Sequence, residues 1–183
     1  MKQDTLKAVS PIDGRYYENT STLNPYVSEY ALIYFRIEIE VRYLEALSKE
    51  GIIRKFTVKE QKLLKDIYEL KSESEANKVK EIEDKVRHDV KAVEIYLREK
   101  LKTTSLKDVI EYLHFALTSE DINNIAYRLT LKRGFESVVL PKYKTLLKSI
   151  LDFSEENIHL PMLARTHGQD AIPTTLGKET CVF

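Results

Sequence analysis

The stretch Tyr30–Leu47, which reads YALIYFRIEIEVRYLEAL, decides the fold class of this protein. Its apolar and aromatic residues recur at steps of three and four, at Tyr30, Ile33, Tyr34, Ile37, Val41, Leu44 and Leu47. That spacing predicts an amphipathic α-helix, because residues three and four apart lie on one side of a helix. Asn24–Pro25 is typical of a helix start, since the fixed φ of proline suits the first helical turn, and Gly51 marks the end.

Helix signals continue beyond this stretch. Thr57 and Glu60 have the spacing of a capping box, in which each side chain satisfies a free backbone donor, so a second helix is expected to about Lys71. Residues 72–87 are highly charged with a thin apolar stripe, which predicts a solvated helix. A further helix is expected to carry Val90, Val93, Leu97 and Leu101.

The second half of the chain is also expected to be mainly helical. Ser105–Asp108 and Thr118–Asp121 resemble helix starts, and residues 122–158 are expected to be mostly helical. Within that run Gly134 and Pro141 are the points where a helix would be interrupted or kinked. A loop is expected over residues 162–173, and Pro173 is expected to open a final helix. Because this helix reaches Phe183 without a cap, the sequence is interpreted as the N-terminal portion of a longer protein.

Composition limits the class of protein. The 183 residues include 29 basic and 29 acidic side chains, so the net charge of zero gives no general attraction to nucleic acid or to an anionic membrane. Five Gly and five Pro disfavour a turn-rich β-sandwich. Cys181 is the only cysteine, which excludes a disulfide framework and a cysteine-based zinc site. We therefore expect a soluble, cytoplasmic, all-α protein.

Four stretches carry polar residues that helix packing does not require. The first is Ser10–Tyr16 (SPIDGRY), in which a tight Asp-Gly turn precedes Arg15 and Tyr16. A guanidinium can bind phosphate or carboxylate, although an arginine in a surface loop is more often ordinary. The second is Arg87–Lys91 (RHDVK), at an expected helix N-terminus, where free N–H groups favour an anion. A helix-start acid and an exposed histidine explain it equally well.

The third and fourth stretches lie further along the chain. In His114–Asp121 (HFALTSED), adjacent hydroxyls at Thr118 and Ser119 can cap a helix, the commoner role, or bind a ligand carboxylate. Ala164–Glu179 (ARTHGQDAIPTTLGKE) places a glycine beside His167, which lets the backbone approach a ligand closely. Histidine suits proton transfer at neutral pH, although a lone histidine is more often structural.

Taken together, the four stretches resemble those of the adenylosuccinate lyase family, within the aspartase/fumarase superfamily. The resemblance runs from SPIDGRY through RHDVKAVE and HFALTSEDINN to RTHGQDAIPTTLGKE, and its specificity comes from their combination in this order. It implies an all-α fold with an N-terminal helical domain, residues 1–104, followed by the first part of a long central helical-bundle domain, residues 105–183. It also implies a homotetramer that pairs its central helices, with active sites that draw residues from three chains.

The family's reaction is a β-elimination that releases fumarate from adenylosuccinate and leaves AMP. The same site cleaves the succinyl-carboxamide imidazole ribotide of purine biosynthesis. Such a reaction needs a base, donors for the negative charge that develops on a carboxylate, and an acid for the departing nitrogen. The resemblance implies these small-molecule substrates and no cofactor, metal, nucleic-acid or membrane partner.

Site residues follow from the resemblance by position. His167 matches the general acid, and His88 matches a second catalytic histidine that orients the substrate. The substrate-binding positions are matched by Arg15, Tyr16, Arg87, His88, Asp89, Thr118 and Ser119. Weaker matches are Lys91, His114 and Gln169.

The sequence differs from the family pattern at two residues, and it lacks one of the family's motifs. Asp170 stands where the purine lyases usually carry proline and is closer to fumarase and aspartase, and Arg87 stands where a close subgroup has asparagine. The family's base, a serine on a mobile Ser-Ser-x-Met-Pro-x-Lys-x-Asn loop, has no counterpart in these residues. The 183-residue chain is therefore expected to be inactive alone. Two alternatives remain open, a fumarase- or aspartase-type lyase and a non-catalytic helical interaction module.

Overall fold

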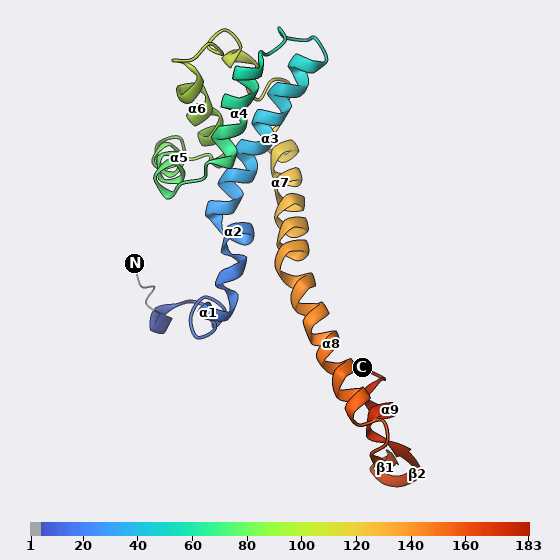
Figure 1. Ribbon diagram of the computed structural model, residues 1–183. Coiled ribbons are helices and arrows are strands. Elements are labelled where there is room, and N and C mark those ends of the chain that lie inside the picture. Colours follow the sequence, from blue (N-terminus) through green and yellow to red (C-terminus); the bar gives the residue numbers. More distant parts are fainter. Residues whose placement is uncertain (1–4) are drawn as a thin grey trace. The chain divides into compact units, whose positions relative to one another are not determined.

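A computed structural model describes residues 5–183 and divides them into two units, residues 5–134 and Phe135–Phe183 (Figure 1). The first unit is helical and contains α1 (Tyr17–Thr20), α2 (Asn24–Val27), α3 (Glu29–Lys49), α4 (Val58–Glu69), α5 (Glu73–Val86), α6 (Asp89–Leu101) and α7 (Ser119–Gly134). Short 3₁₀ turns cover Thr5–Lys7, Ser21–Leu23 and Ile110–Tyr112. The all-α class is confirmed. The expected domain boundary at residue 104 remains a prediction about the complete protein.

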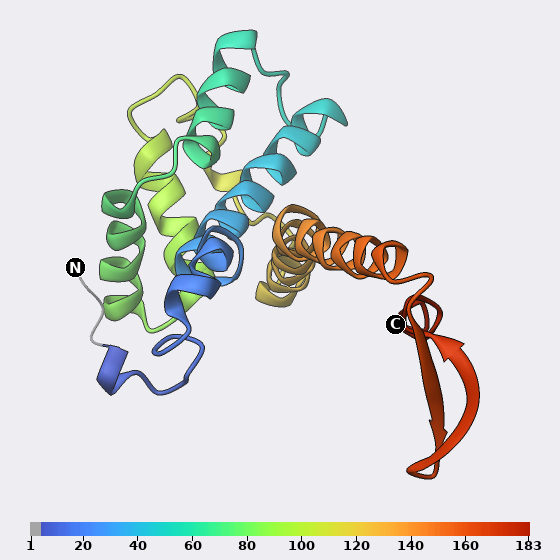
Figure 2. The same cartoon turned by 60° about the horizontal axis from the view of Figure 1, so that its bottom comes forward.

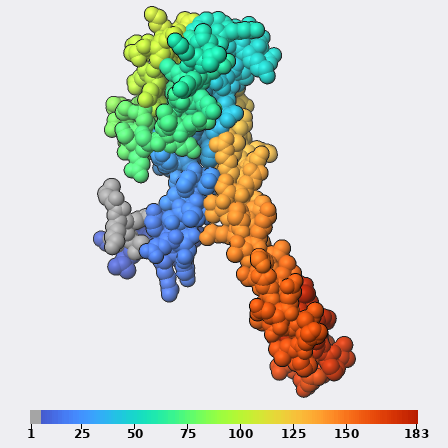
Figure 3. Space-filling view, in the orientation of Figure 1, coloured from blue at the N-terminus to red at the C-terminus, as the bar shows by residue number. Residues whose placement is uncertain are grey.

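Helix α3 is the centre of the first unit and packs against α2, α4, α5, α6 and α7 (Figures 1 and 2). Its predicted apolar stripe is buried, apart from a half-buried Tyr30. Ala31, Phe35 and Ile39 form a second buried cluster on α3 with residues of α6 and α7. The helix is therefore buried on more than the one side that an amphipathic helix would bury, as expected for a helix surrounded by others. Figure 3 shows the atoms of α3–α6 as one continuous outer surface.

The predicted helix boundaries hold where a side chain caps the backbone. The Thr57–Glu60 capping box is confirmed, with each side chain accepting a backbone N–H of the other residue. The charged helix is confirmed as α5, and Ser72 caps its first turn. One expectation was incomplete, since the first long helix does not run unbroken from Asn24. Ser28 adopts an extended conformation and its hydroxyl accepts the Ala31 N–H at 3.2 Å, so α3 begins after a break.

The expected helix start at Ser105–Asp108 was wrong. This segment forms turns because its polar groups bind Arg54 instead of capping a helix. The Arg54 guanidinium donates to the Ser105 carbonyl at 2.9 Å and to the Asp108 carboxylate at 2.6 and 3.0 Å. Asp108 is therefore hydrogen-bonded to a residue more than fifty positions away, a contact that the local sequence pattern does not reveal.

The second unit begins with the interruption that Gly134 and Pro141 predicted. A π-helical turn covers Phe135–Val139, and α8 (Leu140–Glu156) carries the proline in its first turn. Strands β1 (Pro161–Thr166) and β2 (Gln169–Thr175) follow, and then α9 (Leu176–Thr180). Within residues 5–183, no helix is both long enough and apolar enough to cross a membrane.

The loop expected over residues 162–173 was wrong, and the expected final helix starts at Leu176, capped by Thr175, rather than at Pro173. β1 and β2 form an antiparallel hairpin with a register shift between Leu163 and Arg165. The two residues that join the strands, His167 and Gly168, have φ of +54° and +76°. Positive φ at both positions is the geometry of a two-residue hairpin turn, which glycine at the second position favours. Helix α9 packs on α8 through Gly177, whose Cα lies so close that a Cβ would stand 2.4 Å from the Ser154 carbonyl oxygen.

Candidate active site

The centre of the candidate site is a contact between His88 and Ser119, which are 31 positions apart in the sequence. His88 directly precedes α6, and its Nδ1 accepts the Lys91 N–H at 3.2 Å. Because Nδ1 accepts, the neutral ring carries its proton on Nε2 and donates it to Ser119 Oγ, 3.3 Å away. The hydroxyl proton of Ser119 is then available to an acceptor atom of a ligand. The His88 side chain is 49% exposed, so this contact lies on an open surface.

Thr118 is hydrogen-bonded to Asp121 in the first turn of its own helix, and not to His88. It directly precedes α7, and both its N–H and its hydroxyl donate to Asp121 Oδ2, at 2.7 and 3.0 Å. These two hydrogen bonds lower the pKa of the Asp121 carboxyl. The hydroxyl pair predicted from the sequence is thus divided, with Thr118 bonded within its own helix start and Ser119 bonded to another helix.

Arg87 and Asp89, on either side of His88, have different surroundings. Arg87 ends α5 in the left-handed conformation, with φ of +56°, and its side chain is exposed. Asp89 is half-buried, and its Oδ2 accepts from Arg36 Nη2 at 2.5 Å. Burial alone would raise the pKa of the Asp89 carboxyl. The Val90 N–H, Arg36 and His88 together lower this pKa by more than burial raises it, so the net shift is downward. Asp89 is therefore held as a carboxylate beside the His88 ring.

His114 is held by a buried carboxylate of α3. Glu40 is fully buried, and its two oxygens contact the His114 backbone N–H at 3.1 Å and the His114 Nδ1 at 2.5 Å. Burial raises the pKa of Glu40, and the His114 hydrogen bonds oppose that change. His114 and Ala116 have positive φ, +59° and +57°, so the chain makes a sharp turn before Thr118.

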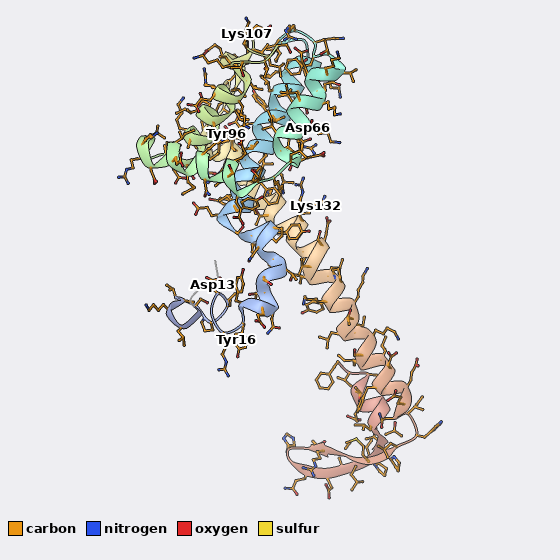
Figure 4. The ribbon with its side chains drawn as sticks, turned by 60° about the vertical axis from the view of Figure 1, so that its left-hand side comes forward. Asp13, Tyr16, Asp66, Tyr96, Lys107 and Lys132 are labelled. Atoms are coloured by element: carbon orange, nitrogen blue, oxygen red, sulfur yellow. The ribbon has the colours of Figure 1, made fainter. Side chains whose placement is uncertain are left out.

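Arg15 and Tyr16 lie on the segment that leads into α1, where Figure 4 labels Tyr16. Both side chains are exposed, and the Arg15 guanidinium lies 5.7 Å from the centre of the Tyr16 ring. Within the described part of the chain, neither side chain has a hydrogen bond or ion pair with His88. Lys91, a weaker match, is occupied by an ion pair with Glu94 at 2.8 Å.

His167 belongs to the second unit. It occupies the first position of the β1–β2 turn and is exposed, with Gly168 beside it and Gln169 paired with Thr166. Asp170 pairs with Arg165 in the hairpin register and is also exposed. The turn therefore presents the histidine at the tip of a hairpin, with little protein around it. The structure joins His88 with Ser119, and it describes His167 only within its own unit.

The buried charged residues that support this site were not predicted from the sequence. Arg36, Glu38 and Glu40 are each at most 5% exposed. Arg36 also donates from Nε to Asn123 Oδ1 at 2.9 Å, and Glu38 forms a two-point ion pair with Arg133 at 2.7 Å. The available signal was charge inside the run FRIEIEV, where apolar residues flank every charged one. Buried charges need bonded partners, so such a pattern indicates long-range ion pairs.

A groove of the first unit lies away from His88 and Ser119. It has a volume of about 700 Å³ and is lined by residues of α3, α4 and their connection, among them Lys49, Lys55, Lys62 and Lys65. None of the predicted site residues lines it. Within residues 5–183, no group of three or more His, Cys, Asp or Glu side chains could hold a metal ion.

Comparisons with known proteins identify the family of this chain. A family model described as lyase matches residues 14–183. The adenylosuccinate lyase of Legionella pneumophila (strain Corby) is 43% identical over 187 residues, which cover 100% of this chain and 41% of that protein. The adenylosuccinate lyase of Escherichia coli (strain K12) is 43% identical over 183 residues, which cover 98% of this chain and 40% of that protein. The chain thus spans about 40% of the length of these relatives.

Solved structures share the fold at low sequence identity. The fumarate lyase from Mesorhizobium sp. BNC1 matches with a TM-score of 0.71 and 20% identity, over 88% of this chain and 36% of that one. The beta-carboxy-cis,cis-muconate cycloisomerase from Acinetobacter calcoaceticus sp. ADP1 matches with a TM-score of 0.68 and 20% identity, over 88% and 37%. With the family model covering nearly all of its length, the chain belongs to the lyase family and is a homologue of the adenylosuccinate lyases.

Proposed function

We propose that this chain supplies part of the active site of an adenylosuccinate lyase, which cleaves adenylosuccinate to AMP and fumarate and performs the equivalent cleavage on the succinyl-carboxamide imidazole ribotide. The observation that carries the proposal is the contact between His88 and Ser119. Two separate sequence motifs meet there at the starts of α6 and α7. The 43% identity to adenylosuccinate lyases over the whole chain supports the choice of substrate.

The roles of the residues follow from their chemistry. The positive dipole ends of the two helix starts, together with the Ser119 hydroxyl, suit the carboxylates of a succinyl group, on which negative charge develops. His88 orients that hydroxyl by donating from Nε2. Arg15 and Arg87 are exposed guanidinium groups suited to a phosphate or carboxylate of the substrate. His167 is the proposed acid that protonates the departing nitrogen. The base is proposed to lie outside these 183 residues.

Assembly into a homotetramer is part of the proposal, as is a cytoplasmic location, where a purine-biosynthetic enzyme would meet its nucleotide substrates. Support for assembly comes from α8, where Tyr143, Leu146, Leu147, Leu151 and Phe153 are all exposed. Exposed apolar side chains along one helix are typical of an interface. In a tetramer of the aspartase/fumarase type, neighbouring chains would complete each site.

The test is turnover by the complete gene product with adenylosuccinate, malate and aspartate as separate substrates, followed by fumarate absorbance. We expect fumarate from adenylosuccinate only. Fumarate from malate or aspartate alone would favour a fumarase- or aspartase-type lyase, to which Asp170 points. No turnover and no binding of any of the three would favour a non-catalytic interaction module.

The acid role is tested with His167→Gln, with His159→Gln as the matched control in the same unit. Loss of a general acid costs about 10²–10⁴ in rate. We expect His167→Gln to lose at least about 100-fold in kcat while the fold is retained. The control is expected to keep its activity. Near-wild-type turnover by His167→Gln would remove this residue from the acid role.

A further inference from the structure

Arg36 of α3 is buried between the starts of two other helices. Its side chain is 6% exposed. Nη2 donates to Asp89 Oδ2 at 2.5 Å, in the first turn of α6, and Nε donates to Asn123 Oδ1 at 2.9 Å, in α7. A buried guanidinium is costly unless its donors are paired, so these two contacts determine where the side chain can lie.

Both partners of Arg36 lie next to the residues of the candidate site. Asp89 directly follows His88 in the chain. Asn123 stands four residues after Ser119 in α7, which places the two on the same side of that helix. Asn123 also donates to Glu120 Oε1 at 3.1 Å, so the residue that binds Arg36 is itself hydrogen-bonded to the first turn of α7. The guanidinium therefore fixes the separation of the two helix starts, and with it the 3.3 Å contact between His88 and Ser119.

We propose that Arg36 is a positioning residue of the active site, which keeps His88 and Ser119 within hydrogen-bonding distance by binding Asp89 and Asn123 together. The proposal rests on the proposed lyase function. The planar guanidinium provides donors in two fixed directions, whereas lysine provides a compact charge that cannot donate to both partners in the same way. Misplacing catalytic groups by about 1 Å costs about 100-fold in rate.

The kinetic test compares Arg36→Lys with Arg54→Lys in the complete gene product. Arg54 is a suitable control because it also binds two different side chains, Glu60 and Asp108, and it contacts no residue of the candidate site. We expect Arg36→Lys to lower kcat about 100-fold with a much smaller change in KM. Arg54→Lys is expected to lower stability and to leave kcat unchanged. A folded Arg36→Lys enzyme with wild-type kcat would overturn the proposal.

A second readout needs no substrate. Histidine side-chain NMR on the 183-residue chain, with the His88 signal assigned by His88→Gln, is expected to show that Arg36→Lys shifts the His88 resonance. The signals of His159 and His167 in the second unit should stay in place.

If the wild-type complete product does not cleave adenylosuccinate, the proposed function fails, and an altered His88 signal would still support the positioning role. An unchanged His88 signal in folded Arg36→Lys would overturn it.

Arg36→Lys could fail to fold, since Arg36 is buried. Asn123→Leu then replaces it, because leucine has nearly the same shape and leaves the contact of Arg36 with Asp89 in place. It removes the contact of Arg36 with α7, together with the hydrogen bond from Asn123 to Glu120. The expected result is again a fall in kcat and a shifted His88 signal. Wild-type kcat in folded Asn123→Leu would contradict the proposal.

Discussion

Replacing Glu60 with glutamine tests how strongly one carboxylate stabilises the first unit. The Glu60 side chain is 6% exposed and accepts hydrogen bonds from three neighbouring residues. It accepts from the Thr57 N–H at 2.8 Å, from Arg54 at 2.8 and 3.1 Å, and from the Ser105 hydroxyl at 2.9 Å. Arg54, aided by the other donors, lowers the pKa of Glu60 from 4.5 to about 2.

The magnitude follows from that shift. A fall from 4.5 to about 2 would stabilise the folded state by at most about 3 kcal/mol. Arg54 is 38% exposed, so solvent screens part of the attraction, and we expect Glu60→Gln to lower the free energy of unfolding by about 2 kcal/mol at pH 7.

The pH dependence identifies the charge as the cause. Because the folded state lowers the pKa of Glu60, the stabilisation is complete above the unfolded pKa of 4.5 and is lost as the pH falls toward about 2. Glutamine has no charge to lose. The stability difference between wild type and Glu60→Gln should therefore fall by about half or more between pH 7 and pH 3.

The assay is urea unfolding of the 183-residue chain, followed by circular dichroism at pH 7 and pH 3. Glu69→Gln is the control in the same helix, because Glu69 is 51% exposed and its ion pair with Lys65 spans 3.4 Å. The control is expected to change stability little at either pH. An equal loss for Glu60→Gln at both pH values, or no loss at pH 7, would refute the reasoning.

Three further predictions concern binding, packing and assembly. Arg15→Ala in the complete gene product should weaken binding of adenylosuccinate more than binding of fumarate, with exposed Arg128→Ala as the control; equal losses in calorimetry would contradict the assignment. Gly177→Ala should destabilise the second unit by about 1–3 kcal/mol, because its Cβ would lie 2.4 Å from a backbone oxygen of α8. Faster hydrogen exchange of the hairpin amides would show this, and unchanged exchange would count against it. The 183-residue chain should self-associate through α8, and charged residues at Leu147 and Leu151 should weaken that association. Light scattering that finds the wild-type chain monomeric would exclude this.

The sequence determined the helices because their signals are local. The steps of three and four in α3, the Thr57–Glu60 capping box and the interruption near Pro141 depend on residues within one or two turns of each other. The family resemblance also came from the sequence, through four motifs in order. These properties could be predicted since neither helix periodicity nor capping needs a distant partner.

Tertiary structure decided what depends on distant partners. Asp108 is hydrogen-bonded to Arg54 and does not start a helix. The buried charged residues Arg36 and Glu38 of α3 are paired with residues of other helices, and no local pattern specifies these partners. The β1–β2 hairpin was overlooked, although its turn residues carried a signal, because only pairing satisfies the backbone of its strands. The contact of His88 with Ser119 likewise exists only because α6 and α7 start side by side, held by one buried guanidinium.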